Sequence, residues 1–325
     1  MHMLRFAAVD LGSLTVRLAV AELTGPGRFK ILSHYRQVTG LGEGLARSDD
    51  LAPVAMDRTL KALKGFVRVM RAQGVEFFRA VATQAVRQAR NRDFFILQVR
   101  ELGLPVRILA PEEEARLSLK GVLSALAPEL AAAPELVVFD VGGGSSEWAI
   151  LGRGREPRFA SLPLGVLTLS QARPLGDPPR PDAVAAMKQD LTARLGKFYQ
   201  ENLQPHLTAP PRLVGTAGAV TTLAALALTM VHYEASRVNN LILTREQLAA
   251  LAETLCRLTE AERARLPGME PAKAGVMVAG ALIVLTILET CRQDSLVAID
   301  AGLLEGVLGE MAEDLRGENY SPPRR

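Results

Sequence analysis

The chain has 325 residues, of which 48% are hydrophobic and 22% are charged, with a net charge of +3 at pH 7. This composition is typical of a soluble globular protein and excludes collagen-like and low-complexity chains. The length predicts about two domains, with room for a hydrophobic core. The small positive charge does not indicate nucleic-acid binding, although it suits an anionic ligand.

The cellular location is predicted from the cysteines and the apolar segments. Cys256 and Cys291 lie in apolar, helical contexts without the spacing of a metal site, so we expect buried thiols in a reducing compartment. Residues 1–5 lead directly into a strand pattern, and no signal peptide is expected. The most apolar run, residues 275–288, is too short to span a bilayer. We therefore expect a cytoplasmic protein without membrane contact.

Residues 136–150, which read L-V-V-F-D-V-G-G-G-S-S-E-W-A-I, are the strongest candidate for a functional segment. An apolar strand carries Asp140 to its end, a glycine turn follows, and Glu147 precedes the next apolar strand. Backbone N–H groups in such a turn can bind phosphate oxygens, and the carboxylates can hold the Mg²⁺ that accompanies phosphate. The turn consists of Gly142, Gly143, Gly144 and Ser145.

This segment has two other interpretations. A glycine hairpin with one aspartate is often only a turn, and this alternative stays open. A dinucleotide-binding unit is disfavoured because its G-x-G-x-x-G pattern needs a following helix, whereas residues 148–152 are short and strand-like.

The same pattern occurs a second time near the N-terminus. Residues 6–9 form an apolar run that leads into Asp10, Gly12 and Ser13, and residues 16–20 then alternate as a second strand would. This Asp, Gly and Ser correspond to those of the later turn. Two such units predict a duplicated fold in which both turns face one cleft. Chance repetition is the weaker alternative.

Further helices and strands surround these two turns. Helical periodicity over residues 54–73, followed by strand patterns at 77–81 and 105–109, predicts an α/β domain with a mixed sheet. Residues 212–214 form a short strand that leads into a glycine turn and a helix. The N-terminus of that helix either binds an anion or serves only for tight packing. The turn contains Gly215, Thr216 and Gly218.

Two charged segments supply further candidates. On a helix over residues 81–91, Thr83, Arg87 and Asn91 would form a polar line, in which Arg87 is either solvated or functional. A second helix opens with Pro111 and three acids, as any helix N-terminus favours, so periodicity alone does not choose a catalytic member. The three acids are Glu112, Glu113 and Glu114.

Several motifs follow one another along almost the whole chain. They are A-A-V-D-L-G-S (7–13), G-L-G-E-G-L (40–45), V-A-T-Q-A-V-R-Q-A-R-N (81–91), P-E-E-E-A-R-L (111–117), V-F-D-V-G-G-G-S-S-E (138–147), L-P-L-G-V (162–166), V-G-T-A-G-A-V-T-T-L (214–223), P-A-K-A-G-V-M-V-A-G-A (271–281) and D-A-G-L-L-E-G-V-L (300–308). In kind and order they resemble the exopolyphosphatase and guanosine pentaphosphate phosphohydrolase (Ppx/GppA) family, in the superfamily of actin, Hsp70 and sugar kinases.

The resemblance implies a duplicated actin-like (ribonuclease H-like) α/β fold with two domains around a central cleft. The domains would span residues 1–125, with the last helix at about 303–325 packed back on them, and residues 126–302. The implied reaction is Mg²⁺-dependent hydrolysis of a terminal phosphoanhydride in inorganic polyphosphate or a guanosine pentaphosphate, and the expected binding partners are polyphosphate or a guanosine penta- or tetraphosphate. A monovalent cation such as K⁺ and a homodimer are further expectations, with no nucleic-acid or membrane partner.

The resemblance also implies roles for the candidate residues. Glu114 is expected to act as general base on the attacking water, with Glu147 assisting the metal or the water. Asp10 and Asp140 are expected to hold Mg²⁺ through water, together with Glu147, and Arg87 is expected to contact phosphate. The other expected phosphate-binding residues are Gly12, Ser13, Gly142, Gly143, Gly144, Ser145, Gly215, Thr216 and Gly218.

Four positions depart from the family pattern. Leu14 stands where Asn is usual, Thr168 stands where Arg is common, and Lys273 and Leu304 replace arginines. Charge-assisted contacts of this type contribute about 1.5–3 kcal/mol each when buried, so the hold on a long phosphate chain is in question. A phosphate-nucleotide sensor with weak or no turnover is therefore the main alternative. An ATP-dependent kinase and an actin-like filament protein are weaker alternatives.

Overall fold

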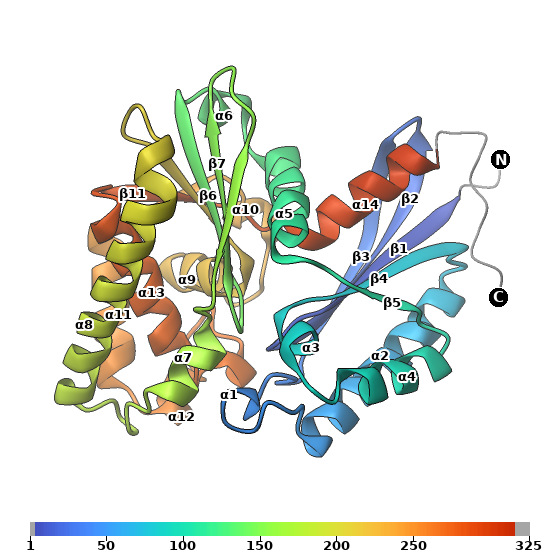
Figure 1. The fold of residues 1–325 in the computed structure, drawn as a ribbon, viewed down its shortest axis with the longest axis horizontal. Helices are drawn as coiled ribbons and strands as arrows, with labels where there is room; N and C mark the ends of the chain where they lie inside the picture. The colour runs from blue at the N-terminus through green and yellow to red at the C-terminus, as the bar shows by residue number, and fades with distance from the viewer. Residues whose placement is uncertain (1–3, 316–325) are drawn as a thin grey trace. The chain divides into compact units, whose positions relative to one another are not determined.

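The computed structural model describes residues 4–315, and the chain divides into two compact units (Figure 1). Unit 1 comprises Met1–Gly121 with Gly302–Arg325, and unit 2 comprises Val122–Ala301. The predicted last helix, at about 303–325, extends beyond the described residues. Within them, helix α14 spans Leu303–Asp314.

Unit 1 is built on a five-stranded mixed sheet with the strand order β3-β2-β1-β4-β5. The first three strands form an antiparallel meander, whereas β4 and β5 run parallel to β1. The register places Asp10 of β1 directly opposite Arg17 of β2. The strands span Arg5–Leu11 (β1), Thr15–Gly25 (β2), Arg28–Val38 (β3), Phe77–Ala82 (β4) and Val106–Ile108 (β5).

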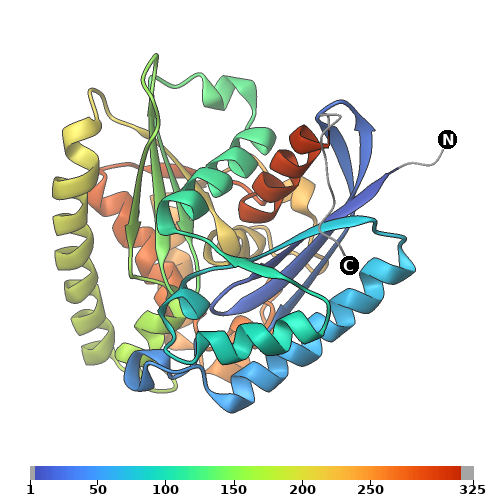
Figure 2. The same cartoon turned by 45° about the vertical axis from the view of Figure 1, so that its right-hand side comes forward.

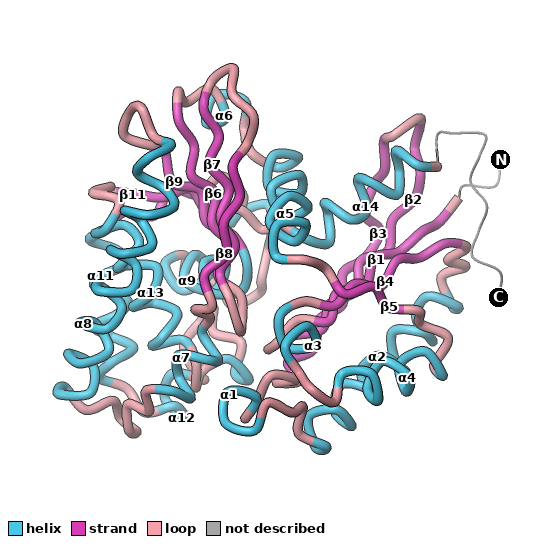
Figure 3. Tube along the Cα trace, viewed as in Figure 1, coloured by secondary structure: helices cyan, strands magenta, loops and turns pink. Residues whose placement is uncertain are grey.

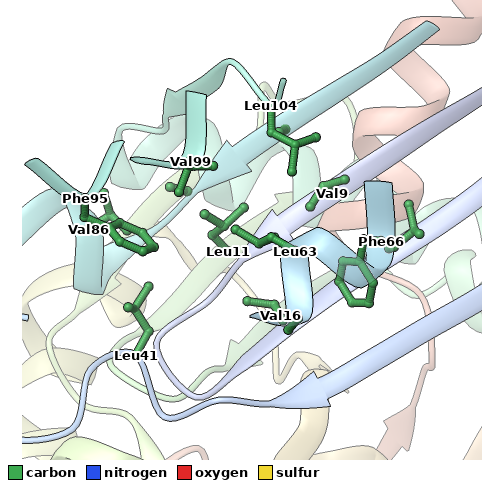
Figure 4. Close-up of a cluster of buried hydrophobic side chains, with 14 of the residues drawn as sticks. Val9, Leu11, Val16, Leu41, Leu63, Phe66, Val86, Phe95, Val99 and Leu104 are labelled. Carbon is green, nitrogen blue, oxygen red and sulfur yellow. The ribbon is translucent and has the colours of Figure 1, made fainter. Parts of the chain in front are cut away.

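Alternation along β1 supplies a hydrophobic core to each face of this sheet. Val9 and Leu11 point toward one face, where Leu63 of α2 packs against them (Figure 4). Phe6 points toward the other face, which α14 covers (Figure 1). The helices of unit 1 span Leu45–Ser48 (α1), Pro53–Ala72 (α2), Gln84–Gln88 (α3), Arg92–Glu101 (α4) and Pro111–Ala125 (α5), the last of which continues into unit 2.

Unit 2 repeats this topology in a six-stranded sheet with the order β10-β11-β9-β6-β7-β8 (Figure 3). Strands β6, β7 and β8 form the antiparallel meander, and β9 and β11 continue the sheet in parallel. The predicted duplicated α/β fold is therefore confirmed. The strands span Glu135–Val141 (β6), Ser146–Gly152 (β7), Arg158–Leu162 (β8), Arg212–Thr216 (β9), Leu241–Thr244 (β10) and Ser295–Ala298 (β11).

The most apolar segment of the chain forms a buried helix of unit 2, α13, which packs against α7, α8, α9 and α11. Among the described residues, no helix combines the length and apolar character needed to cross a bilayer. The larger helices of this unit span Val166–Ala172 (α7), Pro181–Phe198 (α8), Ala217–Ala227 (α9), Arg245–Arg257 (α11) and Met277–Thr290 (α13), and the short ones Pro128–Ala131 (α6), Ala235–Val238 (α10) and Glu260–Arg263 (α12).

The single helix predicted over residues 81–91 is wrong. Strand β4 runs to Ala82, helix α3 ends at Gln88, and Ala89 has an extended backbone with ψ of 134°. Asn91 then precedes α4, and its side-chain amide bonds the backbone of Leu51 in both directions. Asn91 is thereby fixed to the segment before α2, and the polar line through Arg87 does not form.

Candidate functional site

The glycine turn of unit 2 connects β6 to β7 and is closed by a hydrogen bond from Gly142 N–H to Ser145 O, at 3.0 Å. Asp140 and Glu147 lie directly opposite each other on the two strands. Glu147 is buried, and its Oε1 accepts a hydrogen bond from Ser161 Oγ at 3.1 Å. The turn thus carries a carboxylate on each side, as predicted.

The carbonyl groups of this turn face the N-terminus of helix α7. Gly142 O accepts from Val166 N at 3.0 Å, and Gly143 O accepts from Leu167 N at 2.8 Å. Among the described residues, no acceptor is recorded for the backbone N–H groups of Gly143 and Gly144. The peptide groups are therefore oriented with their carbonyls bound by α7 and their donors available to an anion.

Gly165 is required by this arrangement, and sequence reasoning did not identify its role. A Cβ atom at Gly165 would overlap the backbone of Gly143 and Gly144. Thr168, in the same turn of α7, donates from its Oγ1 to Gly144 O at 3.1 Å and accepts from Gly165 N–H. In this chain the threonine that stands in place of a common arginine therefore supports the glycine turn.

The turn of unit 1 has the same internal geometry. Gly12 N–H donates to Thr15 O at 3.2 Å, which matches the three-residue bond of the later turn. Its carbonyls are bound from outside as well: Ser13 O accepts from Gly42 N at 2.8 Å, and Leu14 O accepts from Gly40 N at 2.9 Å. The motif at residues 40–45 thus supports the first turn as α7 supports the second, and Leu14 contributes its carbonyl.

Asp10 is almost fully buried beside this turn, at 2% exposure. Arg17 donates from Nε (2.9 Å) and Nη2 (2.7 Å) to the same oxygen, Oδ2 of Asp10. Within the described residues, the buried Oδ1 atom has no hydrogen-bond partner. The sequence contained a signal for this pair, because a hairpin with the predicted turn places residues 10 and 17 opposite each other.

Glu305, in the first turn of α14, interacts electrostatically with Arg17 of this ion pair. Its Oε2 accepts from Gly302 N–H at 2.8 Å, and its Oε1 lies 3.9 Å from His34 Nε2. Burial raises the pKa of the Glu305 carboxyl, against the lowering effects of the Gly302 hydrogen bond, His34 and Arg17. Leu304, next to it, is buried in the apolar cluster between α14 and the sheet, so this side chain stabilises the fold.

Glu114 is distinguished from the two acids before it by its surroundings. It is 8% exposed, whereas Glu112 is exposed and Glu113 pairs with Arg107 at the surface. Arg87 Nη1 donates to Glu114 Oε2 at 3.1 Å and to Leu109 O at 2.7 Å. The structure thus brings together two residues that the sequence marked separately, the expected base and an expected phosphate ligand.

Helix α5, which carries Glu114, is held by a close crossing with α14. A Cβ atom at Gly306 would overlap Leu117 O, and one at Gly121 would overlap Gly302 O. Such contacts require glycine because any side chain would separate the two backbones. The crossing therefore fixes the position of Glu114 in unit 1.

The third predicted turn, at the start of α9, contains a packing glycine and a buried lysine. A Cβ atom at Gly215 would meet the ring of Phe139 at 2.8 Å, so tight packing explains this glycine. Lys273 is 5% exposed, forms an ion pair with Glu270 at 2.8 Å, and places its ammonium beside Gly218. Thr216 donates from Oγ1 to Ala301 O at 2.8 Å.

The acids of the two turns have the donor chemistry that Mg²⁺ prefers, oxygen from carboxylates and bound water. Among residues 4–315, no group of three or more His, Cys, Asp or Glu side chains is close enough to form a metal cage by itself. The orphaned Oδ1 of Asp10 is a suitable acceptor for a metal-bound water.

Comparison with known proteins places this site in a family. The model of the Ppx/GppA phosphatase family matches residues 19–315. The chain belongs to this family. Exopolyphosphatase 2 of Mycobacterium tuberculosis is 31% identical over 330 residues, covering 96% of this chain and all of that protein.

Solved structures agree with the assignment to the Ppx/GppA family. The crystal structure of the Aquifex aeolicus family member is similar with a TM-score of 0.77 at 32% identity, over 98% of this chain and 100% of that one. The crystal structure of an exopolyphosphatase-like protein is similar with a TM-score of 0.88 at 26% identity, over 98% of this chain and 100% of that one. The predicted family and the predicted enzyme class, a phosphoanhydride hydrolase, are confirmed.

Proposed function

We propose that this Ppx/GppA protein is an exopolyphosphatase that releases the terminal phosphate of inorganic polyphosphate. The observation that carries the proposal is the pair of matched turns, in which bound carbonyls leave backbone N–H groups available beside a buried carboxylate. The end-to-end similarity to proteins named exopolyphosphatase supports the same substrate. Guanosine pentaphosphate offers a similar terminal phosphoanhydride and is the second candidate substrate.

Phosphate binding is assigned to backbone donors and to Arg87. The N–H groups of Gly143, Gly144 and Ser145 would bind one phosphoryl group, and that of Ser13 another, while Gly12 N–H closes its turn by donating to Thr15 O. Ser13 Oγ donates to Gln84 Oε1 at 3.0 Å, which fixes this hydroxyl within unit 1. The roles of Gly142, Gly215, Thr216 and Gly218 are indirect in this proposal, because their recorded contacts support the turns. The predicted cleft, where both turns would contact one substrate, is part of the proposal.

The metal site is assigned to the same two turns. Asp10 through Oδ1, Asp140 and Glu147 would hold Mg²⁺, largely through its bound water. When bound, Mg²⁺ neutralises the charge that phosphoryl transfer concentrates on phosphate oxygens. The expected monovalent cation, the homodimer and the cytoplasmic location stay predictions.

Glu114 is the proposed general base, and its ion pair with Arg87 has a consequence for the reaction. A carboxylate that accepts from a guanidinium is a weaker proton acceptor, because the cation stabilises its charged form. A phosphate group that reaches Arg87 competes for the same guanidinium N–H groups. Substrate binding would therefore withdraw Arg87 from Glu114 and increase the basicity of the carboxylate when water is to be deprotonated.

The test is phosphate release by the purified protein from long-chain polyphosphate and from guanosine pentaphosphate, each with Mg²⁺ and with excess EDTA. We expect release from polyphosphate that EDTA abolishes and added Mg²⁺ restores. Release from guanosine pentaphosphate alone would replace the proposed substrate with the nucleotide. Binding of either compound without release would favour the second candidate, a sensor.

The sensor has one structural observation in its favour. Leu304 is part of the hydrophobic core, and Thr168 is engaged by the glycine turn. Neither residue is a cation, so these two positions do not supply the cationic donor that the family pattern provides there. Equilibrium binding of guanosine tetraphosphate, measured by calorimetry beside the release assay, separates the two functions.

A further inference from the structure

Helix α2 presents a line of cations on the side opposite its buried face. Lys61, Lys64, Arg68 and Arg71 are all exposed and follow one another at spacings of three, four and three residues. At this spacing the side chains lie along one ridge of a helix, which extends about 15 Å at a rise of about 1.5 Å per residue. The helix lies on the outside of unit 1, with its apolar side toward the sheet (light blue in Figure 2). We call these four residues the α2 ridge.

The α2 ridge concentrates the positive charge of the protein. Helix α2 contains five basic residues and one acid, a net charge of +4, whereas the whole chain has +3. The remainder of the chain is therefore slightly negative. A solvated helix face ordinarily mixes both signs, because alternating charges support the helix and limit repulsion.

Most of the ridge is not neutralised by neighbouring acids. Lys61 pairs with Asp57 at 2.7 Å. Among the described residues, no acidic side chain is paired with Lys64, Arg68 or Arg71. Three like charges in adjacent turns repel one another, and this cost is relieved when a polyanion lies across them.

The helix that carries the ridge is bonded to the segment that supports the first glycine turn. Arg58, one turn before Lys61, donates from Nε to Thr39 O at 2.8 Å and pairs with Glu43. The same segment contributes Gly42 N–H to Ser13 O. A linear anion that is held at Ser13 thus has a row of cations in the same unit.

We propose that the α2 ridge binds the distal, non-reacting part of a long polyphosphate chain. This inference rests on the proposed function and adds a second binding surface to it. The occupant is a polyphosphate chain in preference to single-stranded nucleic acid, because a nucleic-acid groove needs exposed aromatic side chains on which bases stack. The single aromatic residue of α2, Phe66, is buried in the core.

The test compares K64E/R68E/R71E with the charge-matched control R153E/K188E/K197E, whose three exposed residues lie in unit 2. Glutamate has nearly the helix propensity of lysine and arginine, so α2 should stay folded, and circular dichroism with thermal unfolding checks this. The ridge variant should raise the KM for long-chain polyphosphate about 10- to 100-fold. Its kcat, and its KM for tripolyphosphate, should change less than about twofold. Wild-type KM for long chains should also rise steeply with NaCl, and this slope should flatten in the variant.

Equal KM changes in the ridge and control variants, or equal changes for long and short chains, would contradict the inference. Direct binding of fluorescently labelled long-chain polyphosphate separates it from the proposed function. Wild type could bind the polymer without releasing phosphate, while the ridge variant loses that binding. This result would contradict the proposed hydrolase function and support polyphosphate binding by the α2 ridge. Single-stranded RNA that binds the ridge as tightly as polyphosphate would overturn the assigned occupant.

Discussion

Gly165 directly precedes α7, and its backbone packs against the backbone of the glycine turn of unit 2. The N–H groups of α7 hold the turn's carbonyls, which orients its free N–H groups. The geometry of the proposed phosphate cradle therefore depends on a residue that contacts no phosphate itself.

We predict that Gly165→Ala displaces this turn. The added methyl group overlaps backbone atoms of Gly143 and Gly144, which cannot move aside as a flexible side chain would. Overpacking of this kind costs about 1–3 kcal/mol of unfolding free energy, and phosphate release should fall at least about tenfold. Urea unfolding and initial rates measure the two effects.

Gly196→Ala in α8 is the matched control, because a Cβ at that position meets nothing within 4 Å beyond the backbone of its own helix and its chain neighbours. Alanine in an open helix position should stabilise the fold by about 0.5–1 kcal/mol relative to glycine and leave the rate unchanged. Equal losses in the two variants would show that the turn does not depend on Gly165.

At the residue scale, the sequence was informative where a motif is local. Asp10 and Asp140 were predicted from strand–turn patterns, and the Asp10–Arg17 pair follows from the hairpin register. The bond between Arg87 and Glu114 joins residues 27 positions apart and depends on how α3 and α5 pack, which periodicity does not encode. The sequence pattern indicates a lost cationic donor at Leu304, whereas the burial of this side chain is visible only once α14 lies on the sheet.

At the scale of elements, the crossing of α5 and α14 determines where the proposed base lies. Gly306 approaches Leu117 O so closely that no side chain fits between the helices. Ion pairs from Arg116 to Glu310 and from Lys120 to Glu313 extend the same contact. Glu114 is one turn before Leu117, so a shift of this crossing moves the carboxylate.

We predict that Gly306→Ala lowers both stability and kcat. The new methyl group meets the carbonyl of Leu117, and separation of the helices should cost about 1–3 kcal/mol. The kcat should change by a larger factor than the KM, because Glu114 moves while the proposed phosphate-binding turns stay in place. Urea unfolding and steady-state kinetics with polyphosphate give both quantities.

Gly309→Ala, three residues later in α14, provides the control. A Cβ there meets only the flexible end of Lys120, at 3.1 Å, and the substitution should be neutral or slightly stabilising. An unchanged kcat in the Gly306 variant would mean that the crossing does not position the base.

A pH-dependent prediction concerns Glu305 at the start of α14. Burial raises the pKa of this carboxyl above its unfolded value. Its ionisation therefore costs stability, and the cost appears as pH rises from the unfolded value of about 4.3 through the higher folded value. Glu305→Gln keeps an oxygen acceptor for Gly302 N–H and should be more stable than wild type at pH 8, with little difference below pH of about 4.

Urea unfolding of both proteins at the two pH values measures this difference. A variant that loses more stability at pH 8 than at pH 4 would show that the ionised carboxylate is stabilised by His34 and Arg17 instead.

Helices and strands whose hydrophobic residues recur with one clear period were predictable from the sequence, and those without such a period were not. The strands around both turns and helices such as α2 follow from alternation and from a single apolar face. The helical spacing of Thr83, Arg87 and Asn91 predicts one helix over residues 81–91. Helix α3 instead ends at Gln88, Ala89 has an extended backbone, and Asn91 is bonded to the backbone of Leu51, a contact that periodicity does not encode.

At the scale of the whole molecule, the two units repeat one topology and one turn but carry different chemistry. Unit 1 contributes Glu114, Arg87 and Asp10, whereas unit 2 contributes Asp140 and Glu147. The proposed phosphate donors and the proposed metal acids thus occur in both units, and the proposed base occurs once. This asymmetry makes Glu114 the residue on which the account of the reaction depends.

The most direct measurement is therefore the kcat for phosphate release from long-chain polyphosphate with Mg²⁺, for wild type, Glu114→Gln and the exposed neighbour Glu112→Gln. General-base removal lowers rates by about 10²–10⁴-fold, and we predict a loss of this size for Glu114→Gln with a less than twofold change for Glu112→Gln. A Glu114→Gln enzyme that releases phosphate at the wild-type rate would contradict the account.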